Sequence, residues 1–134
     1  MTLAPPGDHL AGLHGYESPT VVKHEGLYYL FGSELTGWST NDNRYATAAS
    51  LASPWSEWRD FAPAGSATFD SQTSVVVPVH GSEQISFVYV GDRWFQDDLF
   101  HSAPVWLQLH LRDGAAELEW RDAWAIDPAT GAFY

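Results

Sequence analysis

The chain of 134 residues contains no cysteine, and its six basic side chains are outnumbered by 17 acidic ones. The absence of cysteine excludes disulfide bonds, thiolate nucleophiles and cysteine metal ligands. The formal net charge of −11 disfavours binding to nucleic acid or to anionic membranes, because both are negatively charged. An acidic chain is compatible with neutral ligands such as sugars, although the charge is equally explained as an aid to solubility.

Long apolar runs are also missing from the sequence. No run approaches the ~20 residues that cross a membrane as a helix, so no membrane partner is expected. Residues 1–8 have neither the basic nor the apolar region of a secretory signal peptide. We therefore expect a cytoplasmic protein if the chain stands alone, and a secreted one if it is part of a longer protein.

Helical periodicity is nearly absent, and short β-type runs separated by turn residues take its place. Predicted strands form two groups, at residues 20–24, 27–32, 44–48 and 58–61, and at residues 72–79, 85–90, 105–111 and 116–120. The sequence therefore predicts an all-β fold. It consists of two four-stranded antiparallel units, residues 17–66 and 67–122, with a tail at 123–134, in one partial domain spanning 1–134.

Four-stranded antiparallel units of about 40–50 residues are typical of β-propeller blades. An eight-stranded β-sandwich fits a similar span and stays open as an alternative. Two blades cannot close a ring, since propellers contain at least about four. The chain is then either part of a longer propeller or a self-associating protein. A trimer would supply six blades, and a dimer four, or nearer five if N-terminal residues add strands.

Several stretches together resemble one enzyme family. Residues 15–33, in which Glu17, a small residue and Pro19 open a blade, resemble a segment of glycoside hydrolase family 43. Residues 34–39, 71–73 and 91–94 resemble the exo-β-1,3-galactanase branch of that family, and residues 122–127 resemble the end of its catalytic propeller. The resemblance extends over about residues 15–131.

The resemblance implies a five-bladed propeller with an inverting active site at its central axis. This chain would match the last two blades, with Glu17 at the position of the general acid. Gln72 would match a glutamine that takes part in place of the usual base in the galactanase branch. The usual base and the carboxylate that tunes the acid would lie on absent blades. Asp70 or Asp92 of a neighbouring chain are candidates for the tuning carboxylate.

Glycoside hydrolysis requires a proton donor at the leaving oxygen and a water on the opposite face of the sugar. A glutamic acid serves as donor when burial or a neighbouring carboxylate raises its pKa. Glu17 directly precedes an apolar strand, which suits that role, although a solvated carboxylate at a strand start is the simpler alternative. Gln72 can orient a water but cannot act as an ordinary base, and its alternative is a structural amide.

Sugar sites usually combine an aromatic platform with carboxylates and amides that bridge hydroxyl groups. The candidates for sugar binding are Tyr16, Glu34, Thr36, Trp38, Asn41, Asp92, Arg93 and Trp94. The alternatives left open are a structural ion pair between Asp92 and Arg93, and a place in the core for Trp94.

The six histidines show no metal-ligand spacing, and no phosphate loop or nucleophile elbow is present. We therefore expect no metal and no cofactor, with a structural cation at the propeller axis left open. The sequence predicts a glycosidase for galactan- or arabinan-type carbohydrates, acting as a dimer or trimer. A non-catalytic carbohydrate-binding fragment and a structural remnant are the alternatives.

Overall fold

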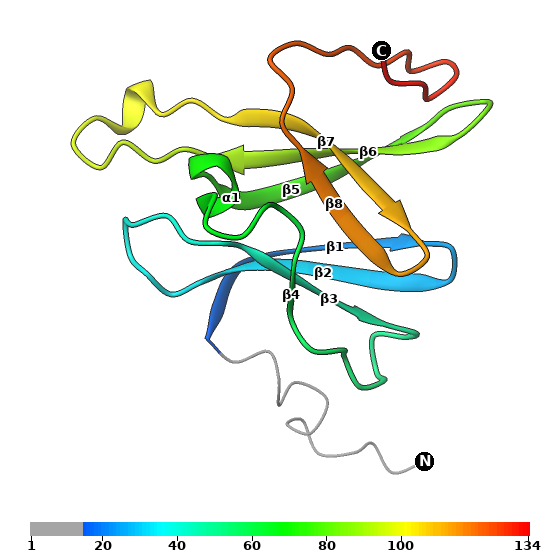
Figure 1. The fold of residues 1–134 in the computed structure, drawn as a ribbon, viewed down its shortest axis with the longest axis horizontal. Coiled ribbons are helices and arrows are strands. Elements are labelled where there is room, and N and C mark those ends of the chain that lie inside the picture. The colour runs from blue at the N-terminus through cyan, green and yellow to red at the C-terminus, as the bar shows by residue number, and fades with distance from the viewer. Residues whose placement is uncertain (1–14) are drawn as a thin grey trace.

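The computed structural model describes residues 15–134 and shows two four-stranded antiparallel sheets packed against each other (Figure 1). The first sheet consists of β1 (Tyr16–His24), β2 (Leu27–Glu34), β3 (Arg44–Ala48) and β4 (Arg59–Asp60). The second consists of β5 (Gln72–His80), β6 (Ile85–Asp92), β7 (Val105–Arg112) and β8 (Ala115–Glu119). The all-β prediction is confirmed, and each predicted strand is found with its ends shifted by a few residues.

Each sheet is a simple meander whose spatial order follows the chain, β1 to β4 and then β5 to β8. No strand is exchanged between the two sheets in the described part of the chain, whereas β-sandwiches of the immunoglobulin type use Greek-key crossings. The blade interpretation is therefore the correct one. No helix within residues 15–134 is long and apolar enough to span a membrane.

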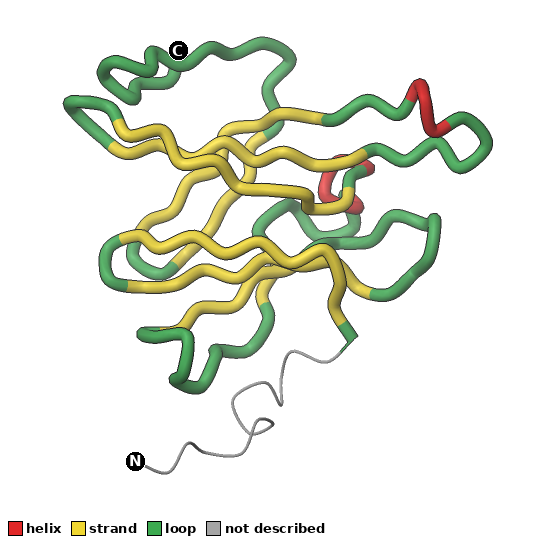
Figure 2. The backbone as a smooth tube through the Cα atoms, turned by 180° about the vertical axis from the view of Figure 1, so that it is seen from behind, coloured by secondary structure: helices red, strands yellow, loops and turns green. Residues whose placement is uncertain are grey.

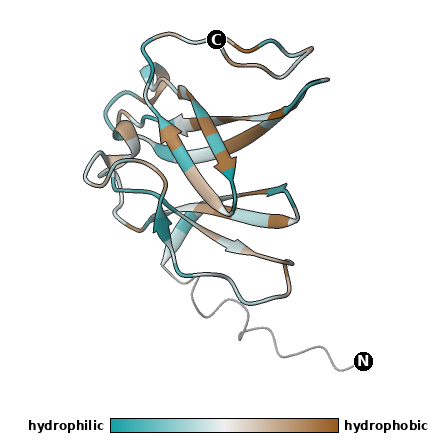
Figure 3. Ribbon diagram, turned by 45° about the vertical axis from the view of Figure 1, so that its right-hand side comes forward, coloured by the Kyte–Doolittle hydropathy of each residue, from teal (hydrophilic) through white to brown (hydrophobic). Residues whose placement is uncertain are grey.

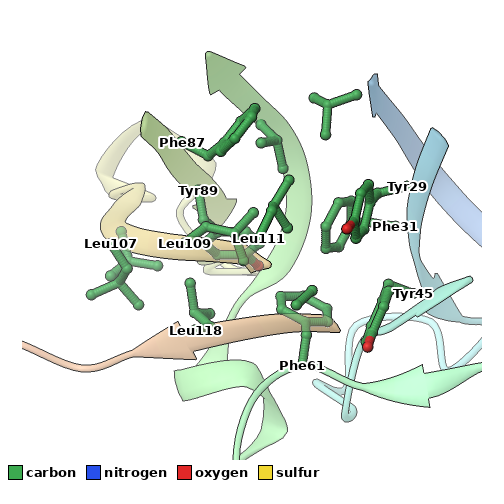
Figure 4. Packing of buried hydrophobic residues seen from close by; sticks show 14 residues of the cluster. Tyr29, Phe31, Tyr45, Phe61, Phe87, Tyr89, Leu107, Leu109, Leu111 and Leu118 are labelled. Atoms are coloured by element: carbon green, nitrogen blue, oxygen red, sulfur yellow. The ribbon is translucent and has the colours of Figure 1, made fainter. Parts of the chain in front are cut away.

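The core lies between the two sheets, because alternate residues of each strand point to the same side (Figure 4). In β2 these residues are Tyr29 and Phe31, and in β6 they are Phe87 and Tyr89. Leucines at alternate positions of β7 complete the cluster. The hydropathy colouring of Figure 3 shows the same alternation of apolar and polar residues along the strands.

The first strands of the two sheets, β1 and β5, are neighbours and begin at the same end of the molecule (Figures 1 and 2). The Ser18 hydroxyl donates a hydrogen bond to the Thr73 carbonyl, and the Val76 amide donates to the Thr20 hydroxyl over 3.3 Å. Both strands carry an irregularity near this end, between residues 17 and 20 and between 73 and 75. The two sheets thus share the same strand order and the same irregularity in their first strand.

Two short elements were not predicted, η1 (Leu99–His101) and α1 (Ala67–Asp70). All four residues of α1 have positive φ, from 50° at Ala67 to 57° at Phe69, so it is a left-handed turn. For residues other than glycine this backbone costs about 1–2 kcal/mol each. The surrounding structure has to supply contacts that hold the turn in place.

The C-terminal residues fold back on themselves and dock against the turn between β5 and β6, at the end opposite to α1 (Figure 1). Ala125 and Tyr134 exchange backbone hydrogen bonds of 2.7 and 3.0 Å. A Cβ atom at Gly81 would lie 2.0 Å from the Thr130 carbonyl carbon, so only glycine permits this approach.

Candidate active site

The two residues predicted to carry the chemistry meet where β1 and β5 begin. The Gln72 side chain donates a hydrogen bond from Nε2 to Oε1 of Glu17, over 3.1 Å. Both side chains are partly buried, and 55 positions separate them in the sequence. The neighbouring starts of β1 and β5 bring them together.

Within residues 15–134 the Gln72 amide has three hydrogen-bond partners. Its Nε2 also donates to the hydroxyl of Ser33, which is buried, over 2.9 Å. Its Oε1 accepts a hydrogen bond of 3.0 Å from the indole nitrogen of Trp94. Both N–H groups and one lone pair are therefore engaged, and no described residue bonds the second lone pair of Oε1, which can accept from a ligand or a water.

A small hollow beside this amide is lined by polar groups and two tryptophans. Its lining includes Ser33, Trp38, Asn41, Gln72 and Trp94. Trp38 and Trp94 are 54% and 46% exposed. Trp94 is therefore not a core residue, and both indole rings are accessible to a ligand.

Other candidates on the loop between β2 and β3 hold the loop itself together. Asn41 Nδ2 donates to the Glu34 carbonyl over 2.9 Å and to the Thr36 hydroxyl over 2.8 Å. The Thr36 hydroxyl donates in turn to the Ser39 carbonyl over 2.5 Å. The Glu34 carboxylate lies 3.6 Å from the Arg44 guanidinium. These contacts stabilise the segment that carries Trp38.

Tyr16 lies elsewhere, since its ring stacks on Trp58 with 3.9 Å between the ring centroids. It lines an apolar groove that is separate from the hollow and includes Pro19 and Val21. The structure thus places Tyr16 on the outer face of the first sheet.

Arg93, a candidate for sugar binding or for an ion pair with Asp92, contacts α1 instead. Its Nη2 donates to the Phe69 carbonyl of α1 over 2.8 Å, and its guanidinium lies 5.6 Å from the Trp120 ring centroid. Within residues 15–134 no salt bridge joins it to Asp92, so the ion-pair alternative is wrong. Within residues 15–134 neither Asp92 nor Asp70 of the same chain forms a hydrogen bond with Glu17, and tuning of Glu17 by these residues of a neighbouring chain stays a prediction.

Sequence reasoning missed the buried polar residues that surround Gln72. Ser33, Asn43 and Ser71 are each at most 1% exposed. Ser33 ends an apolar run, but Asn43 and Ser71 lie among other polar residues, so nothing in the sequence marks them as buried. The described residues contain no group of three or more His, Asp or Glu side chains that could hold a metal ion.

No family model and no curated protein matches the chain, but solved structures do. A protein assigned as an exo-β-1,3-galactanase from Bifidobacterium bifidum s17 is 47% identical over 85% of this chain and 38% of its own, with a TM-score of 0.76. The exo-β-1,3-galactanase from Phanerochaete chrysosporium, solved with galactose, is 36% identical over 90% of this chain and 27% of its own, with a TM-score of 0.83.

A family 43 β-1,3-galactosidase solved with galactodeoxynojirimycin is 30% identical over 81% of this chain, with a TM-score of 0.74. The chain spans between 27% and 38% of the length of these three proteins. The predicted resemblance is confirmed: the chain is a part-length relative of the exo-β-1,3-galactanases of glycoside hydrolase family 43, and its two sheets correspond to blades of their five-bladed propeller.

Proposed function

We propose that the chain supplies the proton-donor side of a glycosidase active site, with Glu17 as general acid and Gln72 as the group that orients water. The hydrogen bond between Glu17 and Gln72, beside two exposed indole rings, is the observation that carries this proposal. The names of the similar proteins favour β-1,3-linked galactans over arabinans as substrates.

The chemistry divides between the two side chains. The Glu17 carboxyl would protonate the oxygen of the leaving sugar. The free lone pair of Gln72 Oε1 would accept a hydrogen bond from the attacking water and so orient it. Gln72 is not basic enough to remove the proton of that water, so another group, such as a carboxylate on a further blade, has to accept that proton.

The direct contact sets a condition on this mechanism. In inverting glycosidases the two catalytic carboxyl groups stand about 6.5–9.5 Å apart, which leaves room for the sugar and the water. The 3.1 Å contact between Gln72 and Glu17 is much shorter. A sugar that enters the site therefore has to separate the two side chains, and Gln72 would keep its bonds to Ser33 and Trp94.

The test of the proposal is galactose release from β-1,3-galactotriose, with an arabino-oligosaccharide of equal length as the comparison. Release of galactose alone supports the galactanase function. Hydrolysis of the arabinan alone would overturn the choice of substrate, and no turnover of either sugar would overturn the enzymatic function for this chain.

A sugar platform at Trp38 predicts a specific loss of binding. We expect Trp38→Ala to weaken binding of β-1,3-galactotriose about tenfold, ~1.4 kcal/mol, because the stacking surface for the sugar is removed. Isothermal titration calorimetry would measure this change. Tyr134→Ala is the control, since Tyr134 is 75% exposed on the C-terminal tail. Equal affinities of Trp38→Ala and the unchanged protein would exclude Trp38 from the site.

A closed propeller around this site requires more blades than the two in this chain. The outer face of the first sheet carries the apolar groove at Tyr16, and the outer face of the second exposes Val75, Val77 and Trp106. We propose that these two faces pack head to tail between copies of the chain, since a head-to-tail contact that closes gives a ring.

Self-association predicts a molar mass of two or three times the 14.9 kDa of one chain. Size-exclusion chromatography with light scattering would measure it. Val77→Lys should return the protein to a monomer, because it places a charge in the contact. Leu99→Lys, at a residue 51% exposed in η1, should leave the mass unchanged. A monodisperse monomer of the unchanged protein would exclude a ring built from copies of this chain.

A second candidate function is carbohydrate binding without hydrolysis. It is favoured by the short contact between Glu17 and Gln72 and by the absence of a second carboxylate bonded to Glu17 within residues 15–134. Galactotriose binding that depends on Trp38, with no galactose released, would distinguish this function from catalysis.

A further inference from the structure

Asn43 is a buried amide that connects the β2–β3 loop to both ends of the Gln72 residue. It is 1% exposed. Its Oδ1 accepts hydrogen bonds from the Thr73 amide and hydroxyl, over 2.6 and 2.9 Å. Its Nδ2 donates to the carbonyls of Asn41 and Ser71, over 3.0 and 3.3 Å. The residues before and after Gln72 are thus held by one side chain.

The same region holds the left-handed turn α1, which leads into Gln72. The Asn43 backbone amide donates to the Thr68 hydroxyl over 2.7 Å. The neighbouring Asp42 carboxylate accepts hydrogen bonds from the Gly65 and Ala67 amides, over 2.6 and 2.8 Å. These contacts offset the unfavourable backbone of the turn and fix the direction in which the chain enters β5.

Ser71 is fixed from the opposite side. Its hydroxyl donates to the Thr68 carbonyl over 2.6 Å and shares a 2.9 Å hydrogen bond with the Tyr89 hydroxyl. Burial raises the pKa of Tyr89 to about 12, so this hydroxyl keeps its proton at neutral pH. A Cβ atom at Gly91 would lie 2.6 Å from the Ser71 hydroxyl oxygen. The residue before Gln72 is therefore held by hydrogen bonds and by the close approach of Gly91.

We propose that Asn43 is a positioning residue, which sets the place of the Gln72 amide and, through it, of the Glu17 carboxylate. The relation of this pair to sugar hydrolysis rests on the proposed function. Asn43 has no hydrogen bond to Glu17 or to the Gln72 side chain in the described chain, so it acts through the backbone on either side of Gln72.

The amide group is required because it acts as donor and acceptor at once. In Asn43→Asp an anionic oxygen would replace the nitrogen that faces the carbonyls of Asn41 and Ser71. This oxygen would face each carbonyl oxygen without a proton between them. In a buried position such unpaired acceptors are costly. The substitution conserves shape, so a disturbance has to arise from the hydrogen bonds.

The Gln72 side-chain amide and the Trp94 indole give NMR signals that report this positioning in the full chain. In Asn43→Asp we expect both signals to shift or broaden, and binding of β-1,3-galactotriose to weaken about tenfold. Thr73→Val, which removes one hydroxyl contact with Asn43, should give a smaller change of the same kind. It also keeps the test decisive if Asn43→Asp does not fold.

Ser86→Ala is the control, because the Ser86 hydroxyl is also buried and donates to the Gly131 carbonyl at the opposite end. It should lower the melting temperature and leave the Gln72 and Trp94 signals in place. Unchanged signals in folded Asn43→Asp and Thr73→Val, or equal shifts in Ser86→Ala, would overturn the proposal. If the unchanged protein binds no galactotriose, the proposed function fails, and the NMR signals still decide the role of Asn43.

Discussion

Glu17→Gln is expected to lower the rate of galactose release from β-1,3-galactotriose by about two to four orders of magnitude, the usual contribution of a general acid. Glutamine has nearly the same shape as glutamic acid, and its Oε1 can still accept the hydrogen bond from Gln72. Its amide cannot give a proton to the leaving oxygen. Initial rates at saturating substrate would measure the loss of the chemical step.

The nature of the leaving group separates a lost acid from a damaged site. In an aryl galactoside with a nitrated phenol, the phenolate is a good leaving group and needs little help from a proton. Glu17→Gln should therefore slow hydrolysis of this substrate much less than hydrolysis of galactotriose. Glu117→Gln, on an exposed position of β8, is the matched control and should keep full activity. Equal losses on both substrates would mean that Glu17 maintains the site and does not donate the proton.

Phe61→Ala is expected to lower the free energy of unfolding by about 3–5 kcal/mol. Phe61 is 3% exposed, and its ring centroid lies 5.0 Å from that of Phe31 and 5.8 Å from that of Tyr89 (Figure 4). Phe61 directly follows β4, and its ring contacts an aromatic residue of each sheet. Removing it would leave a cavity at the contact between the blades.

The control for this prediction is Phe100→Ala, the same change at a side chain that is 91% exposed. We expect its effect to stay within about 0.5 kcal/mol. Urea unfolding followed by tryptophan fluorescence and by circular dichroism would give both values and would test two-state behaviour. Similar midpoints for the two variants would contradict the assignment of Phe61 to the core.

The strands were predictable because their pattern is local. Alternation of apolar residues in β2 and β6 identifies one buried face in each, and the Glu25-Gly26 pair marks the turn between β1 and β2. The family resemblance assigned Glu17 and Gln72 to one site, whereas their direct hydrogen bond was not predicted, because spacing alone does not bring residues of two sheets together.

The left-handed turn before Gln72 was not predictable. Ala67, Thr68, Phe69 and Asp70 include no glycine, the usual sign of positive φ, and their conformation is held by contacts from distant residues. The use of the Asn41 amide within its own loop was also hidden, because the sequence does not show which nearby polar group an amide will bond. A sequence shows that a side chain can form hydrogen bonds, but its partners depend on the folded chain.

The meander topology has a consequence for synthesis on the ribosome. Every strand pairs with its neighbour in the sequence, so each sheet can form from local contacts, which favours fast folding. The buried face of the first sheet, however, is covered by strands that leave the ribosome later. Until β8 has emerged, Tyr29 and Phe31 lack the partners that bury them, and the nascent chain is open to aggregation and to recognition by chaperones.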